Sequence, residues 1–282
     1  MEIVTKIAPI ALALMMLGLG TSLTINDFTR VIKNPKDFLV GLICQLILLP
    51  VIAFALIKLL NVSSELALGV MIIAAAPGGV TSNVLTKFAN GDVALSVSLT
   101  AIISLISIVT VPFIIINSID FFDIAFNQKE ISMKAISLKM FLVVTVPVIL
   151  GIIIRNFAKN FINKYDQIIQ KISVLLFMLV FLAIYIEEWE NIAEYILKAG
   201  LITLILNIVM MAAGYYIAKL FINGMPQQKS IAIECGLQNG TLAVFVATQI
   251  FDNINYLIPT ASYALIMMVT SVFFVIFIKK AA

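Results

Sequence analysis

The chain has 282 residues, of which 62% are hydrophobic and 12% are charged, and its mean hydropathy is +1.13. A soluble globular domain carries about 45–50% apolar and about 25% charged residues, so this composition excludes an ordinary soluble enzyme, a disordered protein and a nucleic-acid-binding protein. The formal net charge is +3 and there is no histidine, which excludes imidazole bases, histidine proton relays and most catalytic zinc sites. Cys44 and Cys235 lie in apolar stretches without metal-ligand spacing, and we expect small core residues there.

Nine segments are long and apolar enough to cross a bilayer, which takes about 20 residues in an α-helix. We expect these segments at 4–25, 37–59, 65–88, 92–117, 133–156, 168–187, 198–221, 227–250 and 256–279. They leave only short connections, so residues 1–282 are predicted to form a single all-α polytopic membrane unit without a separate soluble domain. No small-residue cleavage site follows the first segment, so we do not expect a removed signal peptide.

Charged residues between the segments predict an orientation, because cytoplasmic loops of membrane proteins carry an excess of lysine and arginine. Connections of one parity are basic and hold Arg30, Lys33, Lys36, Lys87, Arg155, Lys159, Lys164, Lys219 and Lys229, with Lys279 and Lys280 at the C-terminus. Connections of the other parity are acidic and hold Asp120, Asp123, Glu130, Glu187, Glu188, Glu190 and Glu194, with Lys129, Lys134, Lys139 and Lys198 as exceptions. We therefore expect a cell (inner) membrane protein with its N-terminus outside and its C-terminus in the cytoplasm.

Two of the nine segments are interrupted near their centres. The third segment, 65–88, carries Pro-Gly-Gly at 77–79, and the eighth, 227–250, carries the run CGLQNG at 235–240. Proline removes a backbone donor, and glycine contributes no side chain to hold a helix. Unpaired backbone groups cost several kcal/mol each in hydrocarbon, so such breaks persist only where they face protein or a wet cavity. Proline and glycine are also common in membrane helices, so a lone Pro147 predicts only a kink.

The positions of the two breaks suggest an internal repeat. They are five segments apart, and the same shift pairs the first, second and fourth segments with the sixth, seventh and ninth. Because five is odd, the members of each pair have opposite orientations in the bilayer. We expect inverted repeats at approximately 1–118, with four helices, and 133–282, with five. Interrupted segments at matching positions of two halves are the best sequence pointer to the binding site of a transporter.

One carboxylate, Glu234, lies deep in an apolar segment. A charge at mid-membrane costs about 2.5–3.5 kcal/mol on insertion scales, so such a residue indicates a functional site, although a protonated or surface-reaching glutamate is the structural alternative. The apolar segments hold no lysine or arginine at that depth as an obvious partner, so a cation from solution is the natural candidate. Glu234 and Gln238 are four residues apart, and we expect them to share a helix face.

Other oxygen-bearing side chains occur at or near the breaks, or in the middle of an apolar segment. They are Gln45, Ser82, Asn83, Ser96, Thr100 and Ser104. Hydroxyl, amide and carboxylate oxygens are hard ligands that suit an alkali cation and do not suit zinc or copper. Serine and threonine alone would be weak evidence because they often bond back to their own helix. Together with Glu234 and the two breaks, they predict an ion site.

Two stretches carry a family resemblance: AAPGGVTSNVLTKFANGDVALSVSLT at 75–100 and ECGLQNGT at 234–241. They make the chain similar to the bile acid:sodium symporter family, and the order of its segments resembles that family over essentially the whole length. The resemblance implies a core domain with two crossed interrupted helices and a panel domain that moves against it. Bacterial relatives have ten helices in two inverted five-helix repeats, and this chain resembles that plan without the first helix.

The resemblance also implies particular ligands. The first sodium site would use Ser82, Asn83, Ser96, Thr100 and Glu234. The second would use Gln45, Glu234 and Gln238 with the main-chain oxygens of Cys235 and Leu237. Asn239 corresponds to a substrate contact, and Gly79, Val80, Thr81 and Gly240 complete the expected substrate set. Some relatives have a hydroxyl side chain directly after the Pro-Gly-Gly motif, whereas this chain has Val80 there.

The expected function is sodium-coupled symport of an organic anion by alternating access, with two Na⁺ per substrate. Half-helix starts are each equivalent to about half a positive charge and attract anionic groups. Two sodium ions would turn the net negative charge of Glu234 into a net positive one, which a monoanion then neutralises. The family carries bile acids and other steroid conjugates, pantoate, and keto acids such as pyruvate. The compact site favours a small carboxylate such as pantoate.

Two other classes of function stay open from the sequence. One is a sodium-independent or proton-coupled organic-anion carrier on the same fold, in which Glu234 titrates. The other is a membrane receptor or structural subunit, which the short loops and broken helices argue against. We do not expect an enzyme, because there is no carboxylate pair, histidine or nucleophile motif. The expected partners are the organic anion and the lipid bilayer, with no nucleic acid, and the sequence gives no oligomeric state.

Overall fold

The computed structural model describes residues 2–24, 27, 29, 31–32, 35–124, 132–187, 189–251 and 253–280. Several residues of the orientation argument lie outside this part of the chain, namely Arg30, Lys33, Lys129, Glu130 and Glu188, together with the side chains of Lys279 and Lys280. The regular structure of the described residues is helical, apart from one isolated antiparallel bridge between Gly78 and Gln238. An all-α membrane fold was the prediction, and it is confirmed.

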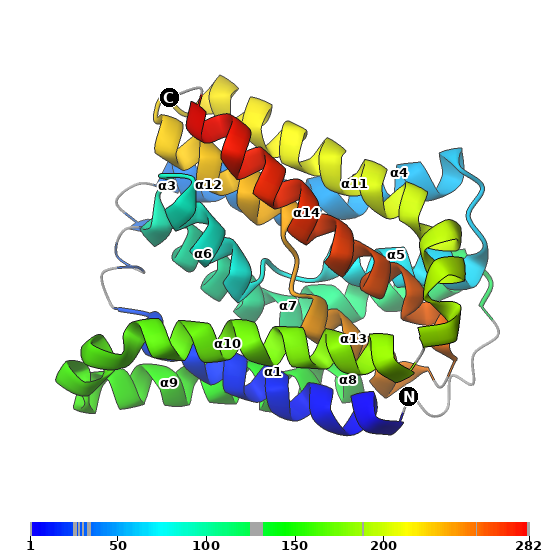
Figure 1. Ribbon diagram of the computed structural model, residues 1–282, viewed down its shortest axis with the longest axis horizontal. Coiled ribbons are helices and arrows are strands. Elements are labelled where there is room, and N and C mark those ends of the chain that lie inside the picture. Colours follow the sequence, from blue (N-terminus) through cyan, green and yellow to red (C-terminus); the bar gives the residue numbers. More distant parts are fainter. Residues whose placement is uncertain are drawn as a thin grey trace.

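The helices follow one another with short connections (Figure 1). The first half of the chain forms α1 (Glu2–Ser22), α3 (Pro35–Ile43), the π-helical turn η1 (Cys44–Leu48), α4 (Leu49–Leu59), α5 (Ser64–Ala75), α6 (Val80–Phe88) and α7 (Val93–Phe121). The second half forms α8 (Met133–Met140), the π-helical turn η2 (Phe141–Thr145), α9 (Val146–Phe157), α10 (Lys159–Glu187), η3 (Trp189–Asn191), α11 (Ile192–Phe221), α12 (Met225–Gly236), α13 (Gly240–Ile250), η4 (Ile254–Tyr256) and α14 (Ile258–Lys280).

Seven helical stretches in the described residues are long and apolar enough to cross a membrane. Neither α5 nor α6 is among them, because helices of 12 and 9 residues span only about 18 and 14 Å. The same holds for α12 and α13, with 12 and 11 residues. The expected breaks at 77–79 and within 235–240 are therefore present in the structure, the second at 237–239. The count of nine crossings stays a prediction, since it requires each interrupted pair to act as one crossing.

The helix at 168–187 begins earlier than the sequence predicts. It starts at Lys159, so Asp166 lies on the helix and not in a connection before it. Similarly, α11 begins at Ile192, before position 198. Hydropathy marks the part of a helix that is apolar, whereas these helices continue into polar sequence.

The helices form two groups that pack face to face. In Figure 1, α1, α9 and α10 lie side by side along the lower edge, and α1 packs against both α9 and α10. The other group contains α3 to α7 and α11 to α14, with the broken helices between the two long helices α7 and α14. The smaller layer touches the larger group through α13, α7 and α6. The division into a panel and a core stays a prediction, for which these two groups are the candidates.

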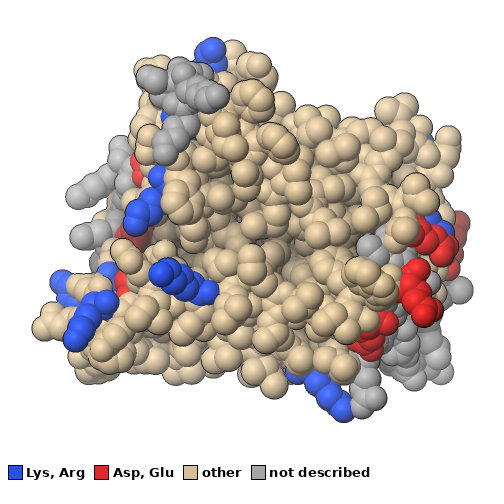
Figure 2. Space-filling view, viewed as in Figure 1, with Lys and Arg blue, Asp and Glu red and all other residues tan. Residues whose placement is uncertain are grey.

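Charge separates along the long axis of the molecule. Figure 2 shows most of the visible lysine and arginine side chains at one end and most of the visible acidic side chains at the other. The first helix starts at the acidic end, and α14 ends at the basic end (Figure 1). Between the ends, large apolar side chains such as Phe113, Leu182 and Phe277 are exposed on the outer faces of the helices. A surface of this kind is expected for helices that contact lipid.

Candidate ion and substrate site

The two broken helices meet where their chains are extended. Asn239 N donates to Pro77 O at 2.7 Å, and Gly79 N donates to Leu237 O at 3.3 Å, which forms the antiparallel bridge between Gly78 and Gln238. These hydrogen bonds satisfy backbone groups that the interrupted helices leave free. The crossing therefore holds the ends of α5 and α12 next to the starts of α6 and α13.

Glycine at position 78 leaves room for the buried carboxylate, over which the crossing passes directly. A Cβ atom on Gly78 would overlap Glu234 Oε2 and would lie 3.1 Å from Gln45 Nε2. The absence of a side chain lets the first crossing approach Glu234 closely. The Pro-Gly-Gly motif thus has a packing role in addition to ending the helix.

Glu234 is fully buried and accepts hydrogen bonds from three hydroxyl groups on two other helices. Ser82 on α6 and Ser96 on α7 both donate to Oε1 through short contacts. Thr100 Oγ1 lies 3.1 Å from Oε1 and 3.0 Å from Oε2. Asn83 Oδ1 completes the group, 2.8 Å from Ser96 Oγ and 3.5 Å from Thr100 Oγ1. The five residues expected for the first sodium site therefore lie together.

This cluster holds more close oxygen–oxygen contacts than it has hydroxyl protons. Ser82 Oγ lies 2.6 Å from Gly79 O in addition to its contact with Glu234. Ser96 and Thr100 each face both Glu234 and Asn83 Oδ1. A hydroxyl donates one proton, and carboxylate and amide oxygens only accept. Some of these contacts must therefore join two acceptors, which is favourable only where a cation or an additional proton lies among them.

The residues expected for the second sodium site gather at the main chain of Glu234 and Cys235. Gln45 is in the π-helical turn η1 and donates from Nε2 to Glu234 O at 2.6 Å. Gln238 Nε2 donates to Cys235 O at 2.9 Å. The oxygens Gln45 Oε1 and Gln238 Oε1 are buried and have no hydrogen-bond partner among the described residues. Leu237 O, in contrast, already accepts from Gly79 N.

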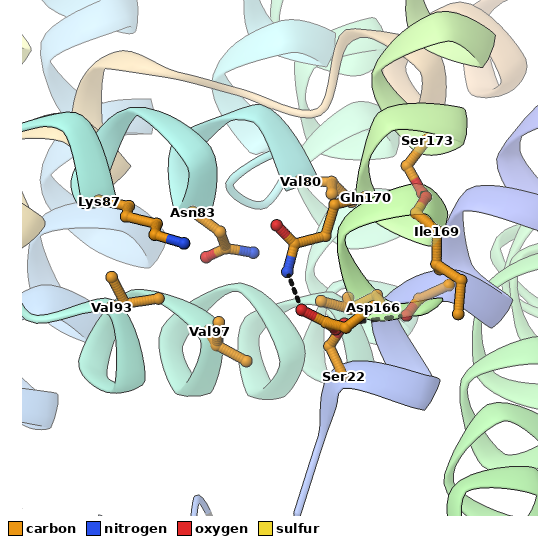
Figure 3. A pocket seen from close by; sticks show the side chains of 12 residues that line it. Ser22, Val80, Asn83, Lys87, Val93, Val97, Asp166, Ile169, Gln170 and Ser173 are labelled. Atoms are coloured by element: carbon orange, nitrogen blue, oxygen red, sulfur yellow. Dashed lines mark hydrogen bonds between the residues drawn. The ribbon is translucent and has the colours of Figure 1, made fainter. Parts of the chain in front are cut away.

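A cavity of about 310 Å³ lies beside the crossing, between α1 and α10 on one wall and α6 and α7 on the other. Figure 3 shows side chains from both walls pointing into this space. Its polar lining consists of Ser22, Asn83, Lys87, Asp166, Gln170 and Ser173. Asn83 belongs to both places, because its Oδ1 faces the Glu234 cluster and its side chain lines the cavity. The ion cluster and the cavity are thus adjacent.

Comparison with known proteins places this arrangement in a family. Residues 9–195 match the family model described as the Sodium Bile acid symporter family. The chain belongs to this family. A sodium symporter must bind both an ion and a second solute, and this chain has an oxygen cluster next to a cavity. As a member of this family, the chain is a multi-pass, sodium-coupled membrane transporter and not an enzyme, as the sequence predicts.

Relatives from distant organisms cover most of this symporter. The "Uncharacterized sodium-dependent transporter YocS" of Bacillus subtilis (strain 168) is 30% identical over 90% of this chain and 77% of its own length. The "Ileal sodium/bile acid cotransporter" of Homo sapiens is 28% identical over 85% of this chain and 68% of its own. The "Probable sodium/metabolite cotransporter BASS2, chloroplastic" of Oryza sativa subsp. japonica is 28% identical over 91% of this chain but only 60% of its own length.

Of the expected substrate residues of this symporter, one lines the cavity and the others do not. Val80, the first residue of α6, lines the cavity. Gly79 and Thr81 lie next to it at the start of that half-helix but are not among the residues that line the cavity. Asn239 Oδ1 accepts from Leu242 N at 3.0 Å and caps α13, whereas its Nδ2 atom is buried without a partner among the described residues. Gly240 packs against Phe181 of α10, since a Cβ atom built on Gly240 would lie 2.6 Å from Cζ of the Phe181 ring.

Two local expectations about the site are wrong. Gln238 does not share a helix face with Glu234, because α12 ends at Gly236 and Gln238 lies in the extended crossing. Ser104 is not part of the oxygen cluster, because its hydroxyl donates to Thr100 O at 2.6 Å on its own helix. A four-residue spacing predicts a common face only while the helix continues, and intrahelical bonding is an alternative for any serine.

Sequence reasoning missed the residues that support the second crossing. Asn207 Nδ2 on α11 and Tyr263 Oη on α14 donate to Gly236 O at 2.7 and 3.0 Å. Thr270 Oγ1, also on α14, donates to Asn207 Oδ1 at 2.5 Å. The signal was available, since Asn207 is a lone amide in the apolar run LILNIVMM. The cavity residue Asp166 was missed because the segment was expected to start at 168, after it. Gln170 lies inside the expected segment but was not singled out.

Proposed function

We propose that this transporter imports a small organic anion together with sodium by alternating access, with two Na⁺ per substrate. The observation that supports this most directly is the proton-poor oxygen cluster around Glu234 at the crossing. Hard oxygen ligands from carboxylate, hydroxyl and amide groups suit an alkali cation. A cation among these oxygens would turn repulsive acceptor pairs into ligand contacts.

The first sodium ion is proposed to bind Ser82, Asn83, Ser96, Thr100 and Glu234. The second is proposed to bind Gln45, Glu234, Gln238 and the main-chain oxygens of Cys235 and Leu237. The unpartnered oxygens Gln45 Oε1 and Gln238 Oε1 support the second set, since buried acceptors are rarely left without a partner. Glu234 would serve both ions, so that binding of one favours the geometry of the other.

The coupling of sodium to an anion follows from the charges. An isolated Glu234 carboxylate repels an anion, and two unit charges 4 Å apart interact by about 4 kcal/mol at an effective dielectric constant of 20. Two sodium ions reverse the sign of the local charge and favour a carboxylate near the starts of α6 and α13. Each ligand then stabilises the arrangement that the other needs, as thermodynamic linkage requires.

The substrate is proposed to be a small carboxylate, with pantoate as one candidate, contacted at Gly79, Val80, Thr81, Asn239 and Gly240. A cavity of about 310 Å³ lies at the low end of the range of about 300–1,000 Å³ for ligand pockets. This volume favours a compact acid over a steroid conjugate. Asn239 supports the assignment because its buried Nδ2 donor is unpartnered at the start of α13.

The orientation and the repeat are part of the same proposal. We place the basic end of the molecule in the cytoplasm of the cell and the N-terminus outside, because lysine and arginine gather at that end (Figure 2). Residues 1–118 and 133–282 are proposed as inverted repeats, each with one interrupted helix. The cavity would then open toward the cytoplasm, since Lys87 and Arg155 mark that end.

Reconstituted vesicles test the proposed function. We expect uptake of the organic acid to require an inward sodium gradient and to increase with an inside-negative potential. Two sodium ions with a monoanion carry one net charge, and the driving force is about 2.3 kcal/mol per 100 mV. Uptake that is unchanged when potassium replaces sodium would contradict the proposal, as would uptake that ignores the potential while requiring sodium.

A proton-coupled carrier is the second candidate, because a carboxyl proton on Glu234 would also relieve the excess of acceptors. Separate jumps in sodium concentration and in pH distinguish the two. Sodium-driven uptake at constant pH supports symport with sodium. Uptake driven by a pH gradient in sodium-free medium supports the proton-coupled carrier.

A further inference from the structure

The α10 wall of the cavity carries an acid that the ion cluster does not use. Asp166 Oδ2 accepts from Gln170 Nε2 at 2.8 Å, and Asp166 Oδ1 accepts from Ser22 Oγ at 3.5 Å. Within the described part of the chain, Asp166 forms no ion pair. An ionised carboxylate has about four acceptor positions, so Asp166 keeps capacity to accept further hydrogen bonds on its cavity side.

The opposite wall of the cavity is positive. Lys87 lies in the last turn of α6, and Val80 at the start of the same helix marks the positive end of the helix dipole. Figure 3 shows Lys87 and Asn83 extending from α6 toward the space that Gln170 faces from α10. Lys87 and Asp166 both line the cavity, and no salt bridge joins them in the described part of the chain. The cavity therefore has a cationic wall and an anionic wall.

An ionised acceptor on the wall of a substrate cavity disfavours a bare anion and favours a substrate that brings a hydrogen-bond donor. A bare carboxylate would be repelled by Asp166 and attracted by Lys87. A molecule with a carboxylate at one end and a hydrogen-bond donor at the other would satisfy both walls. Hydrogen bonds to an ionised acceptor are also roughly twice as strong as neutral ones. The polarity of the two walls thus restricts the proposed small carboxylate to one chemical subclass.

We propose that Asp166, held in place by Gln170, determines specificity by binding a hydroxyl or ammonium group at the far end of a short carboxylate substrate. The inference rests on the proposed symport function and adds a residue outside the crossing. Gln170 acts as a positioning residue, since its amide fixes one oxygen of Asp166. The carboxylate end of the substrate lies toward α6, where Lys87 and the helix start provide positive potential.

A matched series of acids tests the proposal. Butanoate, 4-hydroxybutanoate and 4-aminobutanoate share one carbon chain and differ only in the far end. Each is measured by sodium-driven uptake into vesicles containing the full chain, and by thermal stabilisation in detergent with sodium. We expect the native chain to prefer at least one donor-bearing acid over butanoate by about tenfold or more. The hydroxyl and ammonium probes then identify which donor Asp166 takes.

The variant Asp166→Ala should erase this preference by lowering uptake of the donor-bearing acid. Butanoate, which Asp166 repels, should be taken up at least as well as by the native chain, and stabilisation by sodium alone should persist because Asp166 lies outside the Glu234 cluster. Asp120→Ala is the matched control, because Asp120 is an exposed acid on α7 that does not line the cavity. Gln170→Leu should reduce the preference by a smaller factor. Lys87→Gln should weaken all three acids, whereas Lys219→Gln, an exposed lysine on α11, should not.

Several results would overturn the inference. They are an equal loss of all three acids in Asp166→Ala, a native chain that does not discriminate among them, and a native chain that binds none of them. Sodium-dependent uptake of butanoate without discrimination would contradict only the role of Asp166. Uptake of all three acids without any sodium dependence would instead contradict the proposed function.

Discussion

The two crossings of the broken helices satisfy their free backbone groups differently. At the first crossing, Gly79 O accepts from Ser82 of the following half-helix, and Pro77 O accepts from Asn239 of the second crossing. At the second crossing, Gly236 O accepts from Asn207 and Tyr263, which belong to the long helices α11 and α14. The second crossing is therefore anchored to the surrounding helices. The first is held by its own residues, by the second crossing and by Glu234.

This difference identifies the side of the site that depends on the ion. The start of α6 is connected to Glu234 through Ser82, and α7 is connected to it through Ser96 and Thr100. A change at the carboxylate should thus disturb α6 and α7 more than α12, which has independent anchors. Three substitutions test this comparison.

The largest effect is expected for Glu234→Gln. The change keeps the volume but removes the charge, and a charge contact at 4 Å is worth about 4 kcal/mol at a dielectric constant of 20, which is about three orders of magnitude in affinity. Sodium binding, measured as stabilisation of the detergent-solubilised chain over a sodium titration, should fall accordingly. Hydrogen exchange should rise in α6 and α7 more than in α12.

The control for this variant is Glu194→Gln, which removes an exposed glutamate paired with Lys198 on the surface of α11. It should bind sodium normally. Native sodium affinity in Glu234→Gln would show that the carboxylate is not a ligand, and exchange that rises equally in α12 would contradict the proposed difference between the crossings.

An intermediate effect is expected for Gly78→Ala. The added Cβ overlaps Glu234 Oε2 and presses on Gln45, and overpacking of this kind costs about 1–3 kcal/mol. Sodium affinity should fall by about tenfold or more, because the Glu234 carboxylate and the first crossing must move apart. A sodium titration monitored by thermal unfolding measures both the loss of stability and the loss of sodium affinity.

Gly200→Ala provides the comparison for this glycine, since its Cβ would meet only the γ2 methyl group of Ile196, at 3.3 Å, on a continuous helix. That variant should unfold at or above the native temperature with unchanged sodium affinity. A Gly78→Ala chain that behaves like Gly200→Ala would show that the first crossing does not require close approach to Glu234.

The smallest effect is expected for Asn207→Leu. This substitution removes one donor to Gly236 O, but Tyr263 still donates to the same oxygen, so a loss of about 1 kcal/mol in unfolding free energy is expected. Sodium affinity should change less than in the other two variants. Unfolding of the solubilised chain measures the loss, and Asn117→Leu, an exposed asparagine on α7, should not show it. A larger loss of sodium affinity than in Gly78→Ala would reverse the ranking of the two crossings.

The sequence was informative where a residue type is costly in a membrane. Proline and paired glycines predicted the first break, and an isolated glutamate predicted the centre of the oxygen cluster. Both deductions required only that backbone breaks and charges are expensive in hydrocarbon. The hydroxyls on α6 and α7 could be added because they lie one helical turn apart or directly after a break.

The position of Asp166, the contacts to Gly236 and the π-helical turn could not be deduced from the sequence of a single segment. Asp166 lies in a polar stretch that hydropathy assigns to a connection, although α10 continues through it. The anchoring of Gly236 depends on contacts between distant helices, so the isolated Asn207 gave only a hint. The π-helical turn that positions Gln45 also left no pattern that distinguishes it from an ordinary turn of α-helix.

Asn83 has a further consequence for the fidelity of transport. Its amide oxygen lies in the Glu234 cluster, and the same side chain borders the cavity (Figure 3). Because the amide is planar, a substrate that orients the Asn83 nitrogen also fixes the direction of the Asn83 oxygen. One planar amide would then contact both the ion and the substrate. This would limit slippage, which is the transport of either one without the other.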